Sequence, residues 1–209
     1  MDAKIQKTID NLTKNNMRAF YVEKRGDVVP LIKTLMPKGA SAGSGGSVTL
    51  AECGVIEFLQ GGYAEFLDRE RAAAADFYFS SSNAVTEDGD LYNVDGRANR
   101  VSAIAYGPKN VIIVVGVNKI VKTLQHAAYR VKTIAAPKNC VRLKLDTYCA
   151  QEGKCRSFKI FTDLGALHHV PINEGCDSDS RICCHYLVSG RQRVKERITV
   201  IIVGEELGY

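Results

Sequence analysis

Residues 110–116 read Asn-Val-Ile-Ile-Val-Val-Gly, and the five residues between the polar start and the glycine are all β-branched. β-branched side chains favour strands, and the run has the length of a strand. No polar residue interrupts it, so neither face of the strand is expected to meet water. Strands covered on both faces are typical of parallel sheets with helices on either side. This stretch therefore predicts a central strand of a parallel sheet.

Strand-like and helix-like segments alternate on both sides of this stretch. Apolar residues three or four positions apart indicate helices, and short β-branched or aromatic runs between turn formers indicate strands. The alternation predicts an α/β fold with a mostly parallel sheet and helices on both faces. The expected helices are 4–15, 27–35, 49–60, 97–106 and 119–136, the last ended by Pro137; the expected strands are 19–22, one leading into residue 43, 77–79, 91–94, 110–116 and 197–204.

The whole chain of 209 residues has the size of one ordinary domain. We expect residues 1–17 to form an N-terminal helix that packs on the body. Residues 148–185 show little periodicity and are rich in cysteine, so they are expected to form an irregular insertion within the same domain. The predicted unit is therefore a single domain over 1–209.

The net charge of +5 is modest, and the basic residues are spread along the chain, so no nucleic-acid partner is expected. A local basic group with a spacing of two is typical of the outward face of a β-strand or hairpin; it comprises Arg191, Arg193, Lys195 and Arg197. The longest apolar run, 111–117, is too short to cross a bilayer, and the N-terminus does not resemble a signal peptide. We therefore expect a cytoplasmic protein with no membrane partner, whose cysteines are thiols or metal ligands rather than disulfides.

The first candidate site is the turn Gly43-Ser44-Gly45-Gly46-Ser47, which stands between an expected strand and an expected helix that includes Thr49. Glycine allows the backbone to approach a ligand closely, and the free N–H groups at a helix start bind anions. The turn lacks the Lys-Ser/Thr pair of a P-loop and is not a full dinucleotide-binding fingerprint. A phosphate or carboxylate site and a plain tight turn are both consistent with this pattern.

The second candidate is the segment 83–100, which is denser in Asn, Asp, Gly and Arg than one hairpin needs. Ligands of open α/β sheets bind beyond the carboxyl ends of the strands, where this segment and the glycine turn can share a crevice. The third candidate is the loop after the central strand. Lys119 is unfavourable at a helix start, which suggests that it serves an anion instead, and capping of the next helix by Asn118 is the alternative. The residues expected to bind a ligand are Gly43, Gly45, Gly46, Ser47, Thr49, Asn83, Glu87, Asn93, Asp95, Gly96, Asn99, Arg100, Asn118 and Lys119.

The fourth candidate is a group of five cysteines and three histidines between residues 149 and 185. Thiolates bind zinc and iron–sulfur clusters, and a metal would stabilise a loop that has little core of its own. The gaps are wider and less regular than in a zinc ribbon, so free buried thiols are the alternative. The expected ligands of a zinc ion or an iron–sulfur cluster are Cys149, Cys155, Cys176 and Cys183.

These motifs, taken together and in this order, resemble the LUD-domain, or lactate-utilisation protein, family. The stretches that carry the resemblance are 45–50 (GGSVTL), 83–89 (NAVTEDG), 91–96 (LYNVDG), 99–101 (NRV) and 115–121 (VGVNKIV). The resemblance implies one LUD domain with a three-layer α/β/α fold of the NagB/RpiA/CoA-transferase-like type. This sequence departs from the family pattern at the cysteines. Here 20 residues separate Cys155 from Cys176, whereas relatives keep the corresponding two cysteines close together.

Three functions follow as alternatives. The resemblance implies a subunit or accessory protein of a bacterial lactate-to-pyruvate oxidation system that binds a small anionic ligand and meets iron–sulfur subunits. The cysteines suggest a metal-binding or iron–sulfur electron-transfer partner. Fold analogy alone suggests an ATP-dependent cyclo-ligase-like or CoA-transferase-like enzyme. The ligand, the existence of a catalysed reaction and homo-oligomer formation are left open by the sequence.

Overall fold

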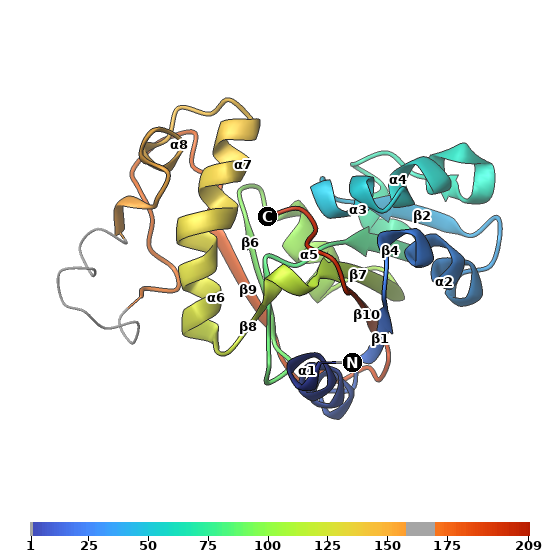
Figure 1. The fold of residues 1–209 in the computed structure, drawn as a ribbon. Helices are drawn as coiled ribbons and strands as arrows, with labels where there is room; N and C mark the ends of the chain where they lie inside the picture. Colours follow the sequence, from blue (N-terminus) through green and yellow to red (C-terminus); the bar gives the residue numbers. More distant parts are fainter. Residues whose placement is uncertain (1, 158–169) are drawn as a thin grey trace.

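The computed structural model describes residues 2–157 and 170–209 (Figure 1). Six parallel strands form the main sheet in the order β1-β10-β7-β4-β2-β3. Their bounds are β1 Arg18–Val22, β2 Ser41–Ser44, β3 Glu65–Phe66, β4 Phe77–Ser80, β7 Asn110–Gly116 and β10 Ile198–Val203. The mostly parallel sheet expected from the sequence is confirmed, with the β-branched strand β7 near its centre.

Helices cover both faces of the main sheet, which gives the three-layer α/β/α arrangement. On one face lie the helices between β1 and β3, and on the other lie α1 and α5 (Figure 1). Their bounds are α1 Ala3–Lys14, α2 Val28–Leu35, α3 Val48–Glu52, α4 Val55–Phe58 and α5 Asn99–Ala105; short 3₁₀ or π turns occupy Arg25–Asp27, Leu59–Tyr63, Ala72–Ala74 and Val117–Lys119. The fold class expected from the alternation is correct.

The buried side chains of β7 show why the run lacks polar residues. Val111, Ile113 and Val115 point into the core on the α1 and α5 side. Ile112 and Val114 point into the core under α2, α3 and α4. All five are almost fully buried, so each alternate side chain contributes to a different core. Replacing any of them by a polar residue would leave an unsatisfied group in one of the two layers.

A second, smaller sheet lies beside the first and was not predicted. It has the order β8-β5-β6-β9 and mixes parallel and antiparallel pairs. Its strands are β5 Ala84–Thr86, β6 Leu91–Asp95, β8 Ile120–Val121 and β9 His185–Ser189. One of its faces adds Val85 and Leu91 to the core of α1 and α5, whereas the other packs Tyr92 against Ala127 and Val131.

The helix expected at 119–136 begins and ends elsewhere. Helix α6 (Leu124–Arg130) starts after β8, continues through a wide turn at Val131–Ala135 into α7 (Ala136–Arg142), and so passes Pro137 instead of ending there. The N–H of Ala136 donates to the carbonyl of Val131, a π-type bond one residue wider than in an α-helix. Proline cannot donate a backbone bond, and a π-bulge in the preceding turn is one way in which a helix accommodates it.

The basic group near the C-terminus lies on the loop between β9 and β10, not on a strand. Arg197 donates to the carbonyls of Ala103, Ile104 and Pro108 and so satisfies the end of α5. Arg191 donates to the carbonyl of Lys14 at the end of α1. These arginines stabilise helix C-termini, where backbone carbonyls lack partners and favour positive charge.

Candidate functional site

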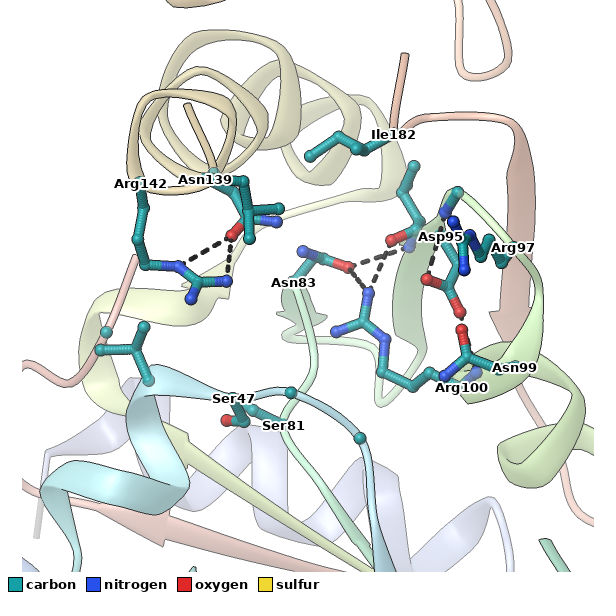
Figure 2. Close-up of a pocket in the computed structure, with 18 of the residues that line it drawn as sticks. Ser47, Ser81, Asn83, Asp95, Arg97, Asn99, Arg100, Asn139, Arg142 and Ile182 are labelled. Atoms are coloured by element: carbon teal, nitrogen blue, oxygen red, sulfur yellow. Dashed lines mark hydrogen bonds between the residues drawn. The ribbon is translucent and has the colours of Figure 1, made fainter. Parts of the chain in front are cut away.

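A cavity of about 1010 Å³ opens where the carboxyl ends of β2, β4 and β7 face the second sheet and α7 (Figure 2). The loops that follow these three parallel strands supply its floor, which is the usual ligand position in an open α/β sheet. Its charged or amide-bearing lining residues are Gln60, Asp68, Arg69, Asn83, Asp95, Arg97, Asn99, Arg100, Lys119, Asn139, Arg142, Asp179 and Arg181. Among the described residues, six cationic side chains therefore face three carboxylates, which favours an anionic ligand.

The glycine turn forms one part of the floor. The N–H of Gly45 donates to the carbonyl of Phe79 at 3.3 Å, which ties the turn to the neighbouring strand. Ser47 caps α3 through its hydroxyl, which accepts from the N–H of Leu50 at 3.2 Å. Within the described residues the N–H groups of Gly46 and Ser47 have no acceptor, and both residues line the cavity. Two backbone donors are thus free to bind a ligand.

Lys119 lies beside this turn at the base of the cavity. Its Nζ donates to the Thr49 hydroxyl at 2.8 Å and to the Ser81 hydroxyl at 3.0 Å, and only 4% of the residue is exposed. Over 2–157 and 170–209, no carboxylate lies within 4.0 Å of this amine. The pKa of Lys119 is lowered to about 7, mainly by burial and in addition by the neighbouring cations Arg130 and Arg100.

Arg100 supplies a second cation on the wall opposite α7 (Figure 2). Its Nη2 donates to Asn83 Oδ1 at 3.0 Å and to the carbonyl of Val94 at 2.6 Å, which fixes the guanidinium in place. Burial lowers the pKa of Arg100, and the nearby Asp95 opposes that effect. Nε and Nη1 have no partner within the described part of the chain, so they remain available to a ligand.

Asp95 is the acidic residue closest to Arg100 in the sequence, but its carboxylate accepts hydrogen bonds from backbone N–H groups. One carboxylate oxygen accepts from the N–H of Gly96, and the other accepts from the N–H groups of Arg100 and Val101. These are the free donors at the start of α5, so Asp95 caps that helix. Its role is to hold the start of α5 against the cavity.

Arg130 is a functional candidate that the sequence did not indicate. Its Nη1 donates to the carbonyl of Asn83 at 2.7 Å and its Nε to the carbonyl of Asn118 at 3.1 Å. It is buried, and burial lowers its pKa to about 10. The side chain joins the loops after β4 and β7 and adds positive charge near Lys119. Its position within an amphipathic helix gave no signal of this role.

The facing wall comes from α7 and the C-terminal residues (Figure 2). Asn139 Oδ1 accepts from the Arg142 guanidinium and from the Tyr209 hydroxyl, and Arg142 also donates to that hydroxyl at 2.6 Å. Gly208 lies against Lys119, because a Cβ built on it would be 3.4 Å from Nζ. None of these residues was predicted, since polar residues on a helix and at a chain end look like solvent-facing positions.

The structure brings together ten of the fourteen predicted ligand-binding residues in this cavity, and ligand binding by them remains a prediction. The ten are Gly45, Gly46, Ser47, Thr49, Asn83, Asp95, Gly96, Asn99, Arg100 and Lys119. The other four residues, Gly43, Glu87, Asn93 and Asn118, lie outside the lining of this cavity.

Each of these four has a structural role or position instead. Gly43 faces Ala72, where a Cβ would be 2.6 Å from its atoms, so that glycine allows close packing. Glu87 pairs with Lys7 at 3.0 Å on the far end of the hairpin. Asn93 is fully buried in β6 with neither amide atom hydrogen-bonded within the described residues. Asn118 exchanges hydrogen bonds with the backbone of Leu207 rather than capping a helix.

The cysteines do not form a metal centre in the part of the chain that the structure describes. Over 2–157 and 170–209, no group of three or more His, Cys, Asp or Glu side chains is placed to hold a metal ion. Cys149 Sγ lies 3.7 Å from Cys140 Sγ, whereas Cys155 contacts Ser157 and Cys183 contacts Arg181. His168 and His169 lie outside the described residues. Metal binding through these thiols stays a prediction.

The geometry defines a parallel α/β protein with a cationic cavity beyond the carboxyl ends of its central strands. The LUD domain family matches residues 5–203, so the chain belongs to the LUD-domain family, which relates it at family level to lactate utilisation. Among solved structures it is similar to a DUF162 family protein from Deinococcus radiodurans, with 15% identity, 96% of each chain covered and a TM-score of 0.53. At that identity the likeness supports the fold alone. No curated protein matches the sequence.

No helix in the described ranges is both long enough and apolar enough to span a membrane.

Proposed function

We propose that this protein binds a small organic anion, a carboxylate or a phosphate, in the cavity, and that Lys119 anchors the anion. The observation that carries the proposal is a buried amine with no carboxylate within 4.0 Å among the described residues, beside the unpaired N–H groups of Gly46 and Ser47. An ammonium that has lost its hydration is costly unless an opposite charge compensates it. An anion from solution would supply that charge and accept the free hydrogen bonds.

The size of the cavity bears on the ligand. Pockets for ligands of drug or cofactor size are roughly 300–1,000 Å³, and this cavity of about 1010 Å³ is at the upper end of that range. The floor carries the charges, whereas Ile56, Phe66 and Leu143 add apolar surface to the walls. An anion with a larger body, such as a nucleotide or an acyl carrier, therefore fits as well as a three-carbon acid. This leaves ATP and CoA as ligands to test beside lactate and pyruvate.

Membership of the LUD-domain family supports a place for the protein in bacterial lactate-to-pyruvate oxidation, as a subunit or accessory protein in the cytoplasm. Iron–sulfur subunits of such a system and a second copy of the chain are the partners we propose. The electron-transfer alternative depends on cysteine ligands, and no metal-ready group stands among the described residues. Metal analysis after anaerobic purification tests that alternative directly.

Isothermal titration calorimetry tests anion binding with inorganic phosphate, L-lactate, pyruvate, ATP and CoA as separate probes. We expect at least one probe to bind, and we expect Lys119→Met to remove that binding. Lys122→Met is the matched control, because Lys122 is an exposed lysine three residues away. No binding by any probe, or equal binding by the two variants, would contradict the proposal.

A further inference from the structure

We propose that Lys119 is a nucleophilic amine that forms an imine with the carbonyl group of an anionic aldehyde, ketone or 2-oxo acid bound in the cavity. This inference rests on the proposed function, because the anionic group of the substrate must be held at the same floor. It adds a covalent role to a residue that would otherwise serve only as a charge.

The first argument is the position of the amine. Lys119 Nζ is reached from the cavity yet is otherwise enclosed, with Thr49 and Ser81 hydroxyls at 2.8 and 3.0 Å. An ammonium has three N–H donors, and within the described residues only these two acceptors are present. No third acceptor lies within hydrogen-bonding distance of Nζ among the described residues, and Lys119 lines the cavity. A reacting carbon can approach the nitrogen from there.

The second argument is the charge around the amine. Arg100 and Arg130 lie near Nζ, and both disfavour a third positive charge. Glu52 is the nearby carboxylate, but it accepts from the N–H of Gly208 at 2.7 Å and is too far from Nζ for an ion pair. A lysine becomes a nucleophile when it is desolvated or placed next to other cations, because both effects favour the neutral amine. Both conditions hold here.

The third argument is that the cavity floor offers further donors, besides Lys119, for the anionic group of the substrate. The free N–H groups of Gly46 and Ser47 and the unused guanidinium nitrogens of Arg100 can bind a carboxylate or phosphate. These donors share the anionic group with Lys119, so the amine can lose its charge and meet the carbonyl carbon while the anionic group stays bound. The two hydroxyls beside it are proton donors and acceptors. Anion binding is thus shared by several groups of the cavity, and the covalent step falls on Lys119.

The step conserves atoms and electrons without an oxidant or reductant. The lone pair of neutral Nζ forms a C–N bond while the π electrons of the carbonyl move to its oxygen. That oxygen takes up a proton as the nitrogen releases one, and Thr49 or Ser81 can pass the proton between them. The carbinolamine then loses water and a C=N bond forms. The net change is amine plus carbonyl to imine plus water.

Reductive trapping tests the proposal on the full chain. The protein is incubated with sodium cyanoborohydride and either pyruvate or dihydroxyacetone phosphate, which carry a carbonyl beside a carboxylate or phosphate. L-lactate is the matched probe without a carbonyl. We expect intact-mass spectrometry to show one reduced adduct per chain with at least one carbonyl probe and none with lactate, and peptide mapping to place it on Lys119.

Two lysine-to-arginine variants test whether the adduct forms on Lys119. Lys119→Arg keeps a cation but cannot form a stable imine, so the adduct should fall by at least about tenfold, whereas Lys122→Arg should keep it. Adducts spread over surface lysines at the same level in Lys119→Arg would overturn the inference. Binding of pyruvate or phosphate by calorimetry without any adduct would also overturn it and would leave the proposed function standing. Absence of both binding and adduct would remove the two together.

Discussion

Replacing Lys119 by Met should change the stability of the protein in a way that depends on pH. The pKa of Lys119 falls from 10.5 to about 7 in the folded protein. Between these values the unfolded chain binds the proton and the folded chain does not, so stability rises with pH across that interval. Below about pH 7 both states are protonated, and the full cost of burying the charge is present and constant. Met has a similar length and carries no charge to desolvate.

The size of the stability change follows from the difference between the pKa of Lys119 in the unfolded chain and in the folded protein. At ~1.4 kcal/mol per pKa unit, the buried charge destabilises the parent by about 4–5 kcal/mol near pH 6.5 and by about 1–2 kcal/mol near pH 9.5. The variant loses two hydrogen bonds, to Thr49 and Ser81, worth roughly 1 kcal/mol each. Both hydroxyls retain a bond to a backbone carbonyl. Lys119→Met should therefore be more stable than the parent by about 2–3 kcal/mol near pH 6.5 and equal or less stable near pH 9.5.

Urea unfolding followed by circular dichroism, with a thiol reductant and no added anion, measures both free energies at each pH. Comparison of the variant with the parent cancels the other titrating groups, and Lys122→Met controls for loss of a surface lysine. A difference that changes by less than about 1 kcal/mol between the two pH values would refute the reasoning. That result would mean that Lys119 is solvated or already paired with an anion.

Three further predictions concern packing, helix capping and thiol chemistry. Gly45→Ala should destabilise the protein by about 1–3 kcal/mol in thermal melts, because the new Cβ would lie 2.9 Å from the buried hydroxyl of Tyr78. Gly46→Ala is the control and should be neutral, because a Cβ at Gly46 would have no atom of the described residues within 4 Å. Arg197→Met should cost about 2–3 kcal/mol by leaving three carbonyls without their donor, and Arg197→Lys should recover part of it; equal stability of all three proteins would contradict this. Diamide should oxidise Cys140 and Cys149, whose sulfurs are 3.7 Å apart, to a disulfide, seen as a loss of two hydrogens by mass spectrometry; full alkylation of both thiols after treatment would contradict it.

Much of the fold could be predicted because its signals are local. The run Val111–Val115 identified the central strand, and residues 198–203 identified the strand beside it. The glycine turn and the hairpin at 84–95 were found from turn-forming residues, and parallel strands necessarily bring their following loops to one edge. Periodicity misled at Pro137, since a wide turn upstream allows the helix to continue, and it gave no sign of how β9 joins the second sheet.

The site was only partly predictable because its properties depend on contacts distant in sequence. Lys119 was singled out for an unfavourable position at a helix start, which the structure does not show. Its importance comes instead from burial beside Thr49, 70 residues away, and Ser81, 38 residues away. Arg130 and Arg142 resembled ordinary helix surface residues, but the fold places Arg142 in the cavity wall and buries Arg130 against the carbonyls of Asn83 and Asn118.

The sequence by itself determined the class of fold, the central strand and the position of the glycine turn, because each depends on the backbone preference and burial pattern of neighbouring residues. The tertiary structure alone decided which polar groups meet, which cations are stripped of water and which cysteines come into contact. Those properties depend on the field and the packing of residues that are close in space and far apart in the chain. No local pattern encodes them.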